Sequence, residues 1–315
     1  MKIAIFSQKD SFKKELQDRL AVLGEVSYIA ERKEYSEEEL LKFAADAEII
    51  GGGPDPFGGF EKGKPRLMKV IESLPNLKGI CLSTTSFGWV DLDYCKKRNL
   101  PVSNVPGYSR ESVAEHALAM LLCVAKKIFV LDRKTQKGQY KLEMGFELKG
   151  KTLGVIGLGS IGSRVAELGL GIGMKVIAYN RSPKSQPGVE MKSLEEVLKE
   201  SDAIVLGITH EPVNKDFISK KELAMMKDGV IIINNIDKEV VNEDDMAEAI
   251  KSGKVFGYAY ETEDMEHGPL VGLENAIGLE GFAWYTKEAL ENLRRIFVES
   301  VESLAAGKPQ NVVNS

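Results

Sequence analysis

The amino-acid sequence predicts an α/β protein with two Rossmann-like, doubly wound parallel-sheet domains and a cleft between them. Two observations predict this fold class. Short apolar, β-rich runs alternate with longer amphipathic stretches, and a glycine-rich turn follows one of the short runs. Alternation of this kind indicates a parallel sheet covered by helices on both faces. A chain of 315 residues is long enough for about two such domains.

The first half of the chain supplies the first set of alternations. Helices are predicted at residues 11–23 and 36–45, and strands at 2–6, 26–29, 48–50, 79–82 and 102–104. The Gly- and Pro-rich piece 51–65 is too long for an ordinary connection, so we expect a surface loop or a lip of the cleft. Residues 111–131 then predict one long helix, whose apolar middle is typical of a helix between layers or between subunits.

A polar stretch, residues 132–149, leads into the second set of alternations. Strands are predicted here at residues 151–157, 175–179, 203–208, 230–234 and 276–279. They indicate a second open α/β sheet. The last helix, predicted at residues 286–306, is expected to carry the chain back to the first domain.

The charge balance bears on possible partners. Forty-two Lys and Arg stand against 47 Asp and Glu, which gives a net charge of −5 with both signs mixed along the chain. Such a chain has no field that would hold a polyanion, so no nucleic-acid partner is expected. The longest strongly apolar run, residues 117–125, is shorter than the ~20 residues that cross a bilayer, and residues 1–6 lack the apolar region of a signal peptide. We therefore expect no membrane association and a cytoplasmic location.

Cysteine and histidine are scarce. Cys81, Cys95 and Cys123 have no Cys-x-x-Cys spacing and no nearby histidine, so free thiols are expected and no metal site. The chain contains only three histidines, which are His116, His210 and His267. Few side chains are therefore available for imidazole chemistry.

The strongest local motif is a glycine-rich turn between a predicted strand and a predicted helix. It consists of Gly157, Leu158, Gly159, Ser160, Ile161 and Gly162. In a dinucleotide site the first glycine permits the tight turn, the second admits a pyrophosphate and the third lets helix and strand pack closely. Glycines also serve plain turns, but the strand-turn-helix context favours a dinucleotide site.

The residues after the next strand bear on the choice of dinucleotide. Asn180, Arg181 and Ser182 stand where an acidic residue would bind the ribose hydroxyls of NAD. Arginine offers a planar set of donors to a phosphate, so NADP(H) is favoured, and NAD(H) stays possible if this is only an exposed polar turn. Thr209 and His210 also follow a strand near this edge, and both a cofactor contact and a plain loop remain open for them.

Several separate blocks of sequence carry a family resemblance. They are residues 80–92 with 100–102, 104–108 with 112–116, 148–154, the glycine motif and 307–314. With these blocks the chain resembles the D-isomer-specific 2-hydroxyacid dehydrogenases over nearly its whole length. The resemblance implies a discontinuous substrate domain, residues 1–103 with 288–315, and a dinucleotide-binding Rossmann domain, residues 104–287. It also implies a cleft at their junction and a homodimer joined through the helix that contains His116.

The same resemblance implies three catalytic positions, two of which are altered here. Family members reduce a 2-keto acid with an arginine that holds the substrate carboxylate, a histidine that supplies a proton and a glutamate that tunes the histidine. In this sequence Asp237 stands at the arginine position, Gly281 at the histidine position and Glu266 at the glutamate position. Asp237 would repel the carboxylate of a 2-keto acid, so we expect that the standard reaction is lost.

Two functions remain open. The first is hydride transfer with NADP(H) on a non-standard small molecule. Asp237, Glu266, Glu280 and Glu261 would suit a cationic substrate such as an amine or an iminium, which needs less external acid. By resemblance Glu261 also stands near the nicotinamide amide, where relatives carry aspartate. The second function is a non-catalytic dinucleotide-binding sensor or scaffold, because a retained nucleotide motif with altered catalytic positions is also what that role predicts.

Overall fold

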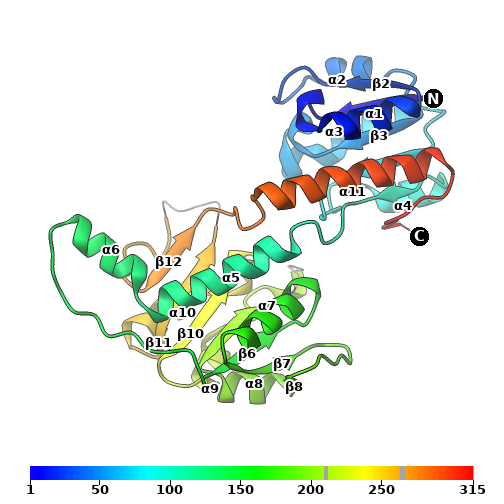
Figure 1. Ribbon diagram of the computed structural model, residues 1–315. Helices are drawn as coiled ribbons and strands as arrows, with labels where there is room; N and C mark the ends of the chain where they lie inside the picture. Colours follow the sequence, from blue (N-terminus) through cyan, green and yellow to red (C-terminus); the bar gives the residue numbers. More distant parts are fainter. Residues whose placement is uncertain (209–211, 263–266, 315) are drawn as a thin grey trace. The chain divides into compact units, whose positions relative to one another are not determined.

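The computed structural model describes residues 1–208, 212–262 and 267–314 (Figure 1). The chain divides into two compact units, Met1–Tyr108 with Lys287–Ser315, and Ser109–Thr286. Each unit contains one parallel β-sheet with helices on both faces. The predicted fold class of two Rossmann-like parallel sheets is therefore confirmed.

The first unit contains a five-stranded parallel sheet of order β2-β1-β3-β4-β5. Its strands are β1 (Lys2–Phe6), β2 (Glu25–Tyr28), β3 (Ile49–Gly52), β4 (Gly79–Leu82) and β5 (Val102–Ser103). Its helices are α1 (Lys14–Val22), α2 (Glu37–Ala44), α3 (Gly59–Ser73), α4 (Leu92–Lys97) and α11 (Lys287–Ala305). Ile3 and Ile5 pack with α1 and α11, whereas Ala4 and Phe6 pack with α2 and α3. Alternate residues of a central strand are thus buried on opposite faces of the sheet, as parallel sheets require.

The second unit contains a seven-stranded parallel sheet of order β12-β11-β10-β9-β6-β7-β8. Its strands are β6 (Thr152–Ile156), β7 (Lys175–Tyr179), β8 (Val189–Met191), β9 (Ala203–Leu206), β10 (Val230–Asn234), β11 (Val255–Glu261) and β12 (Ala276–Leu279). Its helices are α5 (Arg110–Ala125), α6 (Ile128–Gln136), α7 (Ser160–Gly171), α8 (Leu194–Glu200), α9 (Lys220–Met225) and α10 (Glu243–Lys251). Helices α5 and α7 lie side by side on one face, over Val155, Val205 and Ile231 (Figure 1). Helices α8, α9 and α10 cover Ile156, Leu206 and Ile232 on the other face.

The expectation that residues 51–65 form a loop is wrong. A 3-10 turn spans Asp55–Phe57, and α3 begins at Gly59 and includes Pro65 within the helix. Pro65 lies on the exposed side, while Leu67, Val70 and Ile71 bury the opposite side of the helix. Burial of this apolar stripe outweighs the backbone hydrogen bond that a proline cannot donate.

The single long helix predicted for residues 111–131 is also wrong, because it is two helices. Helix α5 ends at Ala125, Lys127 adopts a left-handed φ of 53°, and α6 continues to Gln136. Two residues of the segment after α6 contact this break. Phe146 N donates to Ala125 O at 3.0 Å, and Glu143 pairs with Lys127 at 3.1 Å. Part of the predicted polar stretch, residues 132–136, is therefore helical. Among the described residues, no helix is long and apolar enough to cross a membrane.

Candidate nucleotide site and carboxylate edge

The glycine motif forms a tight turn between β6 and α7. Gly157 adopts a φ of +99°, and its N–H donates to Tyr179 O at 2.8 Å. A Cβ at Gly157 would lie 2.5 Å from Gly207 O, and a Cβ at Gly162 would clash with Gly157 O. Glycine is therefore required at both positions, the first for its backbone conformation and the second for close packing of helix and strand.

Gly159 differs from the other two glycines. Its backbone is extended, with φ −76° and ψ −163°, and a Cβ there would meet no described atom within 4 Å. The fold itself therefore does not require glycine at this position. Helix α7 begins next to it at Ser160, and its first turn, Ser160, Ile161 and Gly162, contains no acidic residue. Open space beside the N-terminus of a helix fits the pyrophosphate of a dinucleotide.

Asn180 braces the glycine turn. Its Oδ1 accepts a hydrogen bond from Leu158 N at 2.9 Å. Its Nδ2 donates to Ser182 O at 2.8 Å and to Ser182 Oγ at 3.1 Å. Arg181 and Ser182 are exposed just beyond the end of β7. The amide of Asn180 is thus engaged by the protein, and Arg181 and Ser182 carry exposed side chains at this position.

Asp237 lies in a short loop after β10 that is held by Asn234. The Asn234 side chain is fully buried, and its Nδ2 donates to Asp237 O at 2.9 Å and to Tyr258 Oη at 3.1 Å. Asp237 Oδ1 accepts from Glu239 N at 2.9 Å, and the half-buried Asp237 caps a 3-10 turn over Lys238–Val240. Lys238 is therefore in a helical turn.

Glu261 is held at the end of β11 and contacts His116 of α5. Its Oε1 accepts from Ala283 N at 2.8 Å and from Phe282 N at 3.1 Å. The Nε2 of His116 lies 3.6 Å from the same oxygen and has no hydrogen-bond partner among the described residues. Burial raises the pKa of Glu261, although the two backbone donors oppose this, and burial lowers the pKa of His116. Both shifts favour the neutral forms of the pair.

The segment after β12 carries Glu280 and Gly281 at the surface. Both residues are exposed, and Glu280 O accepts from Phe282 N at 2.8 Å. A Cβ at Gly281 would meet no described atom within 4 Å, and its φ lies outside the left-handed region. Gly281 is therefore not required by the fold, and a larger side chain has room there.

Three of the predicted acidic residues lie at the carboxyl ends of adjacent strands. Asp237 follows β10, Glu261 ends β11 and Glu280 follows β12, and these strands are neighbours in the sheet. The glycine motif follows β6 at the same edge, which is where open α/β sheets bind ligands. Thr209 and Glu266 lie outside the described residues.

The contact between His116 and Glu261 was not predicted from the sequence. The two residues are far apart in the chain and meet only because α5 lies against β11. The described residues hold no group of three or more His, Cys, Asp or Glu placed to bind a metal ion.

Comparisons with known proteins all lead to one family. The family model "D-isomer specific 2-hydroxyacid dehydrogenase, NAD binding domain" matches residues 118–279. The chain is 31% identical over 294 residues to a hydroxypyruvate reductase of Blautia hydrogenotrophica, covering 88% of each chain. It is 33% identical over 266 residues to a glyoxylate reductase of Thermococcus litoralis, covering 78% of this chain and 80% of the relative.

Solved structures agree. An acyclic imino acid reductase in complex with NADPH and D-Arg has a TM-score of 0.84 at 28% identity, covering 99% of this chain and 100% of the other. A D-2-hydroxyisocaproate dehydrogenase has a TM-score of 0.82 at 25% identity, covering 100% of both chains.

Proposed function

Because the chain belongs to the D-isomer-specific 2-hydroxyacid dehydrogenase family of NAD-binding oxidoreductases, we propose that it is an NADP(H)-dependent reductase of a cationic imine. The substrate is then not a 2-keto acid. The observation that carries this proposal is Asp237. By resemblance it stands where relatives bind the substrate carboxylate with arginine, and the hydrogen bonds of Asn234 hold its loop in a fixed shape.

The charge at the strand edge supports a cationic substrate. Asp237 and Glu280 follow β10 and β12, the two strands on either side of β11, and the resemblance adds Glu266. Carboxylates in a partly desolvated site attract a protonated imine and repel a keto acid. The imino acid reductase of similar structure was solved with NADPH and D-Arg. NADPH is the cofactor proposed here, and D-Arg is a cationic amine, the class of product that reduction of an imine gives.

The division of labour between the two units follows from the family. Dinucleotide binding belongs to the unit Ser109–Thr286, expected from the sequence as residues 104–287, and substrate binding belongs to the unit Met1–Tyr108 with Lys287–Ser315, expected as residues 1–103 with 288–315. The N-terminus of α7 and Gly159 hold the pyrophosphate, and Arg181 with Ser182 holds the 2′-phosphate of NADP(H). NAD(H) binding would then be weaker, because it lacks that phosphate.

The chemistry needs little acid catalysis from the protein. A bound nicotinamide in its reduced form supplies a hydride. An iminium carbon already carries positive charge, so no histidine is needed at position 281 to protonate an oxygen. The task of Asp237 and its acidic neighbours is to attract and orient the cation.

The test is a substrate panel with matched cofactors. NADPH is incubated with glyoxylate, with hydroxypyruvate, and with an aldehyde that lacks a carboxylate, mixed with methylamine or ammonia to form an imine, while absorbance follows NADPH oxidation. We expect turnover only where an imine forms, and slower turnover with NADH. Fast turnover of glyoxylate alone would contradict the proposal.

A non-catalytic role is the second candidate, and Gly281 favours it. The position has room for a side chain but carries none, as in a site that has lost its proton donor. A thermal-shift measurement with NADPH separates the two functions. Tight cofactor binding with no turnover on any member of the panel would favour a sensor or scaffold.

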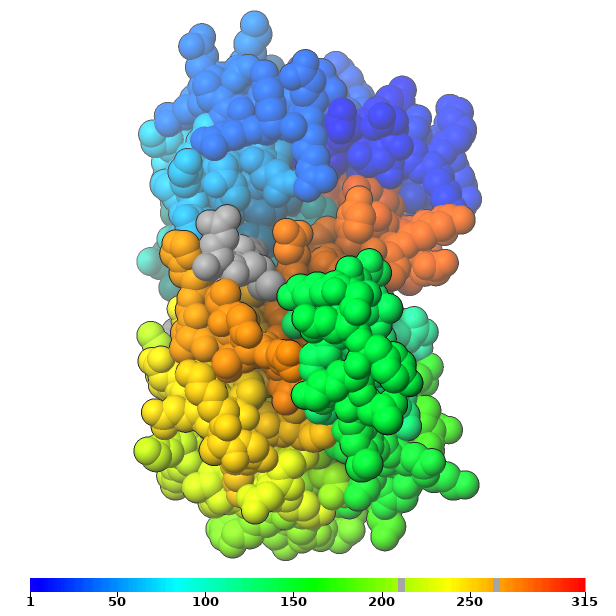
Figure 2. Space-filling model, turned by 90° about the vertical axis from the view of Figure 1, so that its left-hand side faces the viewer, coloured from blue at the N-terminus to red at the C-terminus, as the bar shows by residue number. Residues whose placement is uncertain are grey.

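We also propose a homodimer formed through α5, α6 and the segment that follows α6. Tyr140, Leu142 and Met144 are 93%, 84% and 87% exposed, and Ile128 is exposed as well. Figure 2 shows this segment, in green, at the surface of the molecule. Apolar side chains gathered in this way are typical of a surface that another chain covers.

A further inference from the structure

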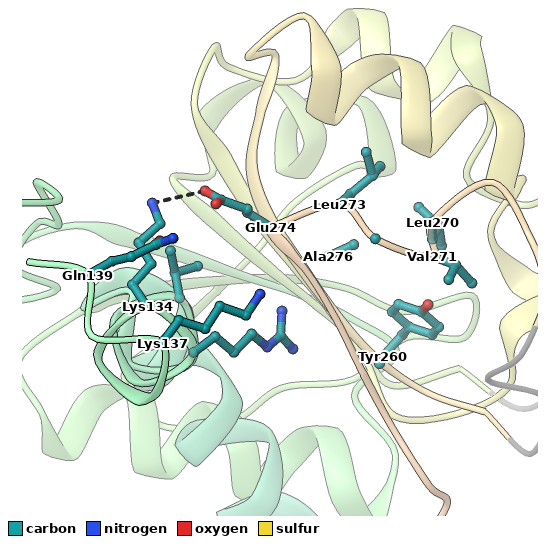
Figure 3. Close-up of a pocket in the computed structure, with 13 residues that line it drawn as sticks. Lys134, Lys137, Gln139, Tyr260, Leu270, Val271, Leu273, Glu274 and Ala276 are labelled. Atoms are coloured by element: carbon teal, nitrogen blue, oxygen red, sulfur yellow. Dashed lines mark ion pairs between the residues drawn. The ribbon is translucent and has the colours of Figure 1, made fainter. Parts of the chain in front are cut away.

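Tyr258 of β11 is buried in the core of its unit, on the sheet face covered by α8, α9 and α10. The residue is only 1% exposed, and its ring stacks on that of Tyr260 with centroids 4.9 Å apart and planes 9° apart. The two tyrosines share this face because residues two apart on a strand point the same way. Tyr260 lines a cavity beside α6 (Figure 3), whereas Tyr258 does not. Packing therefore fixes the Tyr258 ring inside the sheet.

The hydroxyl group of Tyr258 contacts the side chain of Asn234. Tyr258 Oη accepts from Asn234 Nδ2 at 3.1 Å, and Asn234 is itself fully buried. In the register of the two strands, Asn234 is paired with Tyr260 and not with Tyr258. The hydroxyl of Tyr260 nevertheless makes no hydrogen bond with any residue of the described chain. The bond from Asn234 to Tyr258 satisfies a buried hydroxyl and a buried amide at once.

Both donors of the Asn234 amide are engaged. A side-chain amide has two N–H donors, and the second one is donated to Asp237 O at 2.9 Å. On its other side, Asn234 Oδ1 accepts from Ile236 N at 3.2 Å. The same amide that bonds to Tyr258 thus holds the loop after β10 at two backbone positions. The orientation of this amide decides where the loop lies.

We propose that Tyr258 is a positioning residue for Asp237 and so determines how well the site binds a cationic substrate. The Tyr258 hydroxyl orients the Asn234 amide, and the amide fixes the backbone oxygen of Asp237. The Asp237 carboxylate is then directed by the bond that it accepts from Glu239 N at 2.9 Å. A residue buried within the sheet therefore sets the position of the charge at the sheet edge. The effect on substrate binding rests on the function proposed above, whereas the effect on the loop does not.

Packing alone is the competing role of Tyr258. The ring fills space in the core beside Tyr260 and Met246, and a phenylalanine ring would fill the same space. The hydroxyl is the part that packing does not need, so a change confined to the hydroxyl separates the two roles. Burial raises the pKa of Tyr258, so this hydroxyl stays neutral across the neutral pH range and its bond to Asn234 is kept there.

The position of the loop is tested by NMR on the full chain. The variant Y258F should shift the amide signals of Ile236 and Glu239, which donate to Asn234 Oδ1 and Asp237 Oδ1. The matched control is Y260F, which removes a hydroxyl from the stacked ring without removing a hydrogen bond to Asn234. It should leave both signals in place. Unshifted signals in Y258F, or equal shifts in the two variants, would overturn the proposal.

The effect on substrate binding is tested by kinetics with saturating NADPH and the imine of the substrate panel. We expect Y258F to raise KM about threefold to tenfold with kcat nearly unchanged, because one hydrogen bond that positions the charge is lost. Y260F should keep the wild-type KM. If Tyr258 only packs, Y258F would at most lower the unfolding temperature and would leave KM as in wild type, which would refute a role in substrate binding.

The double variant Y258F/D237N separates this inference from the proposed function. If Tyr258 acts on the substrate only through Asp237, the double variant should have the KM of D237N. A rise in KM from Y258F that is as large in the D237N background as in wild type would overturn the route through Asp237. A wild-type KM in D237N would contradict the proposed function instead. The NMR shifts of Y258F would then still decide whether Tyr258 positions the loop.

Discussion

His116 Nε2 lies 3.6 Å from Glu261 Oε1, in a pair whose side chains are 18% and 10% exposed. The same carboxylate oxygen accepts backbone hydrogen bonds from Phe282 and Ala283. Glu261 therefore joins α5, β11 and the segment after Gly281. Burial disfavours the charged form of both residues. Each residue therefore makes the free energy of unfolding depend on pH, in opposite directions.

The first prediction concerns acid stability and His116. Burial lowers the pKa of His116 below its ordinary value of 6.5, so the unfolded chain takes up this proton more readily than the folded one. The stability that this group contributes is thus complete above pH 6.5 and is lost as the pH falls through its folded pKa. Between about pH 6.5 and 5, the free energy of unfolding should fall less in H116Q than in wild type, as measured by thermal unfolding. The exposed His267 offers the control H267Q, which should follow wild type.

The second prediction is the converse effect at Glu261. Burial raises its pKa above the ordinary 4.5, so its stabilising contribution is complete below pH 4.5 and is lost as the pH rises through the folded pKa. In E261Q this loss should be absent, while the amide oxygen still accepts from Ala283 and Phe282. Chemical denaturation from acid to neutral pH measures the difference. The raised pKa would be contradicted if the free energies of unfolding of E261Q and wild type changed with pH in the same way.

The third prediction separates the roles of two glycines in the nucleotide turn. Gly159→Ala should unfold at the wild-type temperature but bind NADPH at least about tenfold more weakly, because its methyl group enters space left for the pyrophosphate. Gly162→Ala should lower the free energy of unfolding by roughly 1–3 kcal/mol, because its methyl group meets Gly157 O. Gly171→Ala, at the other end of α7 in open space, is the matched control for both measurements. Normal NADPH binding by Gly159→Ala would argue against the proposed site.

The fourth prediction tests the charge of Asp237. In D237N the amide oxygen can still accept from Glu239 N, so the cap is kept while the negative charge is removed. KM for an imine substrate should rise about tenfold, with a stability close to that of wild type. The exposed neighbour Glu239 provides the control E239Q, which removes the same charge without affecting KM. Equal kinetics of D237N and wild type would remove the basis of the cationic-substrate proposal.

The fifth prediction concerns association. The double change L142D/M144D places charges on the exposed apolar segment after α6 and should convert a dimer to a monomer in sedimentation experiments. Val22 is 86% exposed in the other unit, so V22D is a control that should leave the mass unchanged. A monomeric wild type would refute the proposed homodimer.

The glycine turn and most strands could be predicted from the sequence because their causes are local. Gly157 and Gly162 are required by contacts within a few residues of the turn or with the adjacent strand, and the apolar runs of β6, β7 and β10 are unambiguous. Two strands were missed. Strand β8 has only three residues at the sheet edge, and β11 interrupts its apolar run with Gly257 and two tyrosines.

Contacts between distant residues could not be predicted in the same way. Two sets of hydrogen bonds depend on which strands are neighbours in the sheet. In the first, Phe282 N and Ala283 N donate to Glu261. In the second, Asn234 donates to Asp237 O and to Tyr258. The break after α5 depends on a contact made by Glu143 from beyond α6. Helical periodicity alone extends that helix, because nothing in residues 126–131 forbids it.

The loop after β10 keeps its shape through the amide of Asn234 and the backbone oxygen of residue 237. The side chain at 237 caps the turn that follows. Other side chains with a hydrogen-bond acceptor can keep this cap, so the cap does not require a carboxylate. A single substitution at 237 can therefore change the sign of the charge at this edge of the sheet without rebuilding the loop.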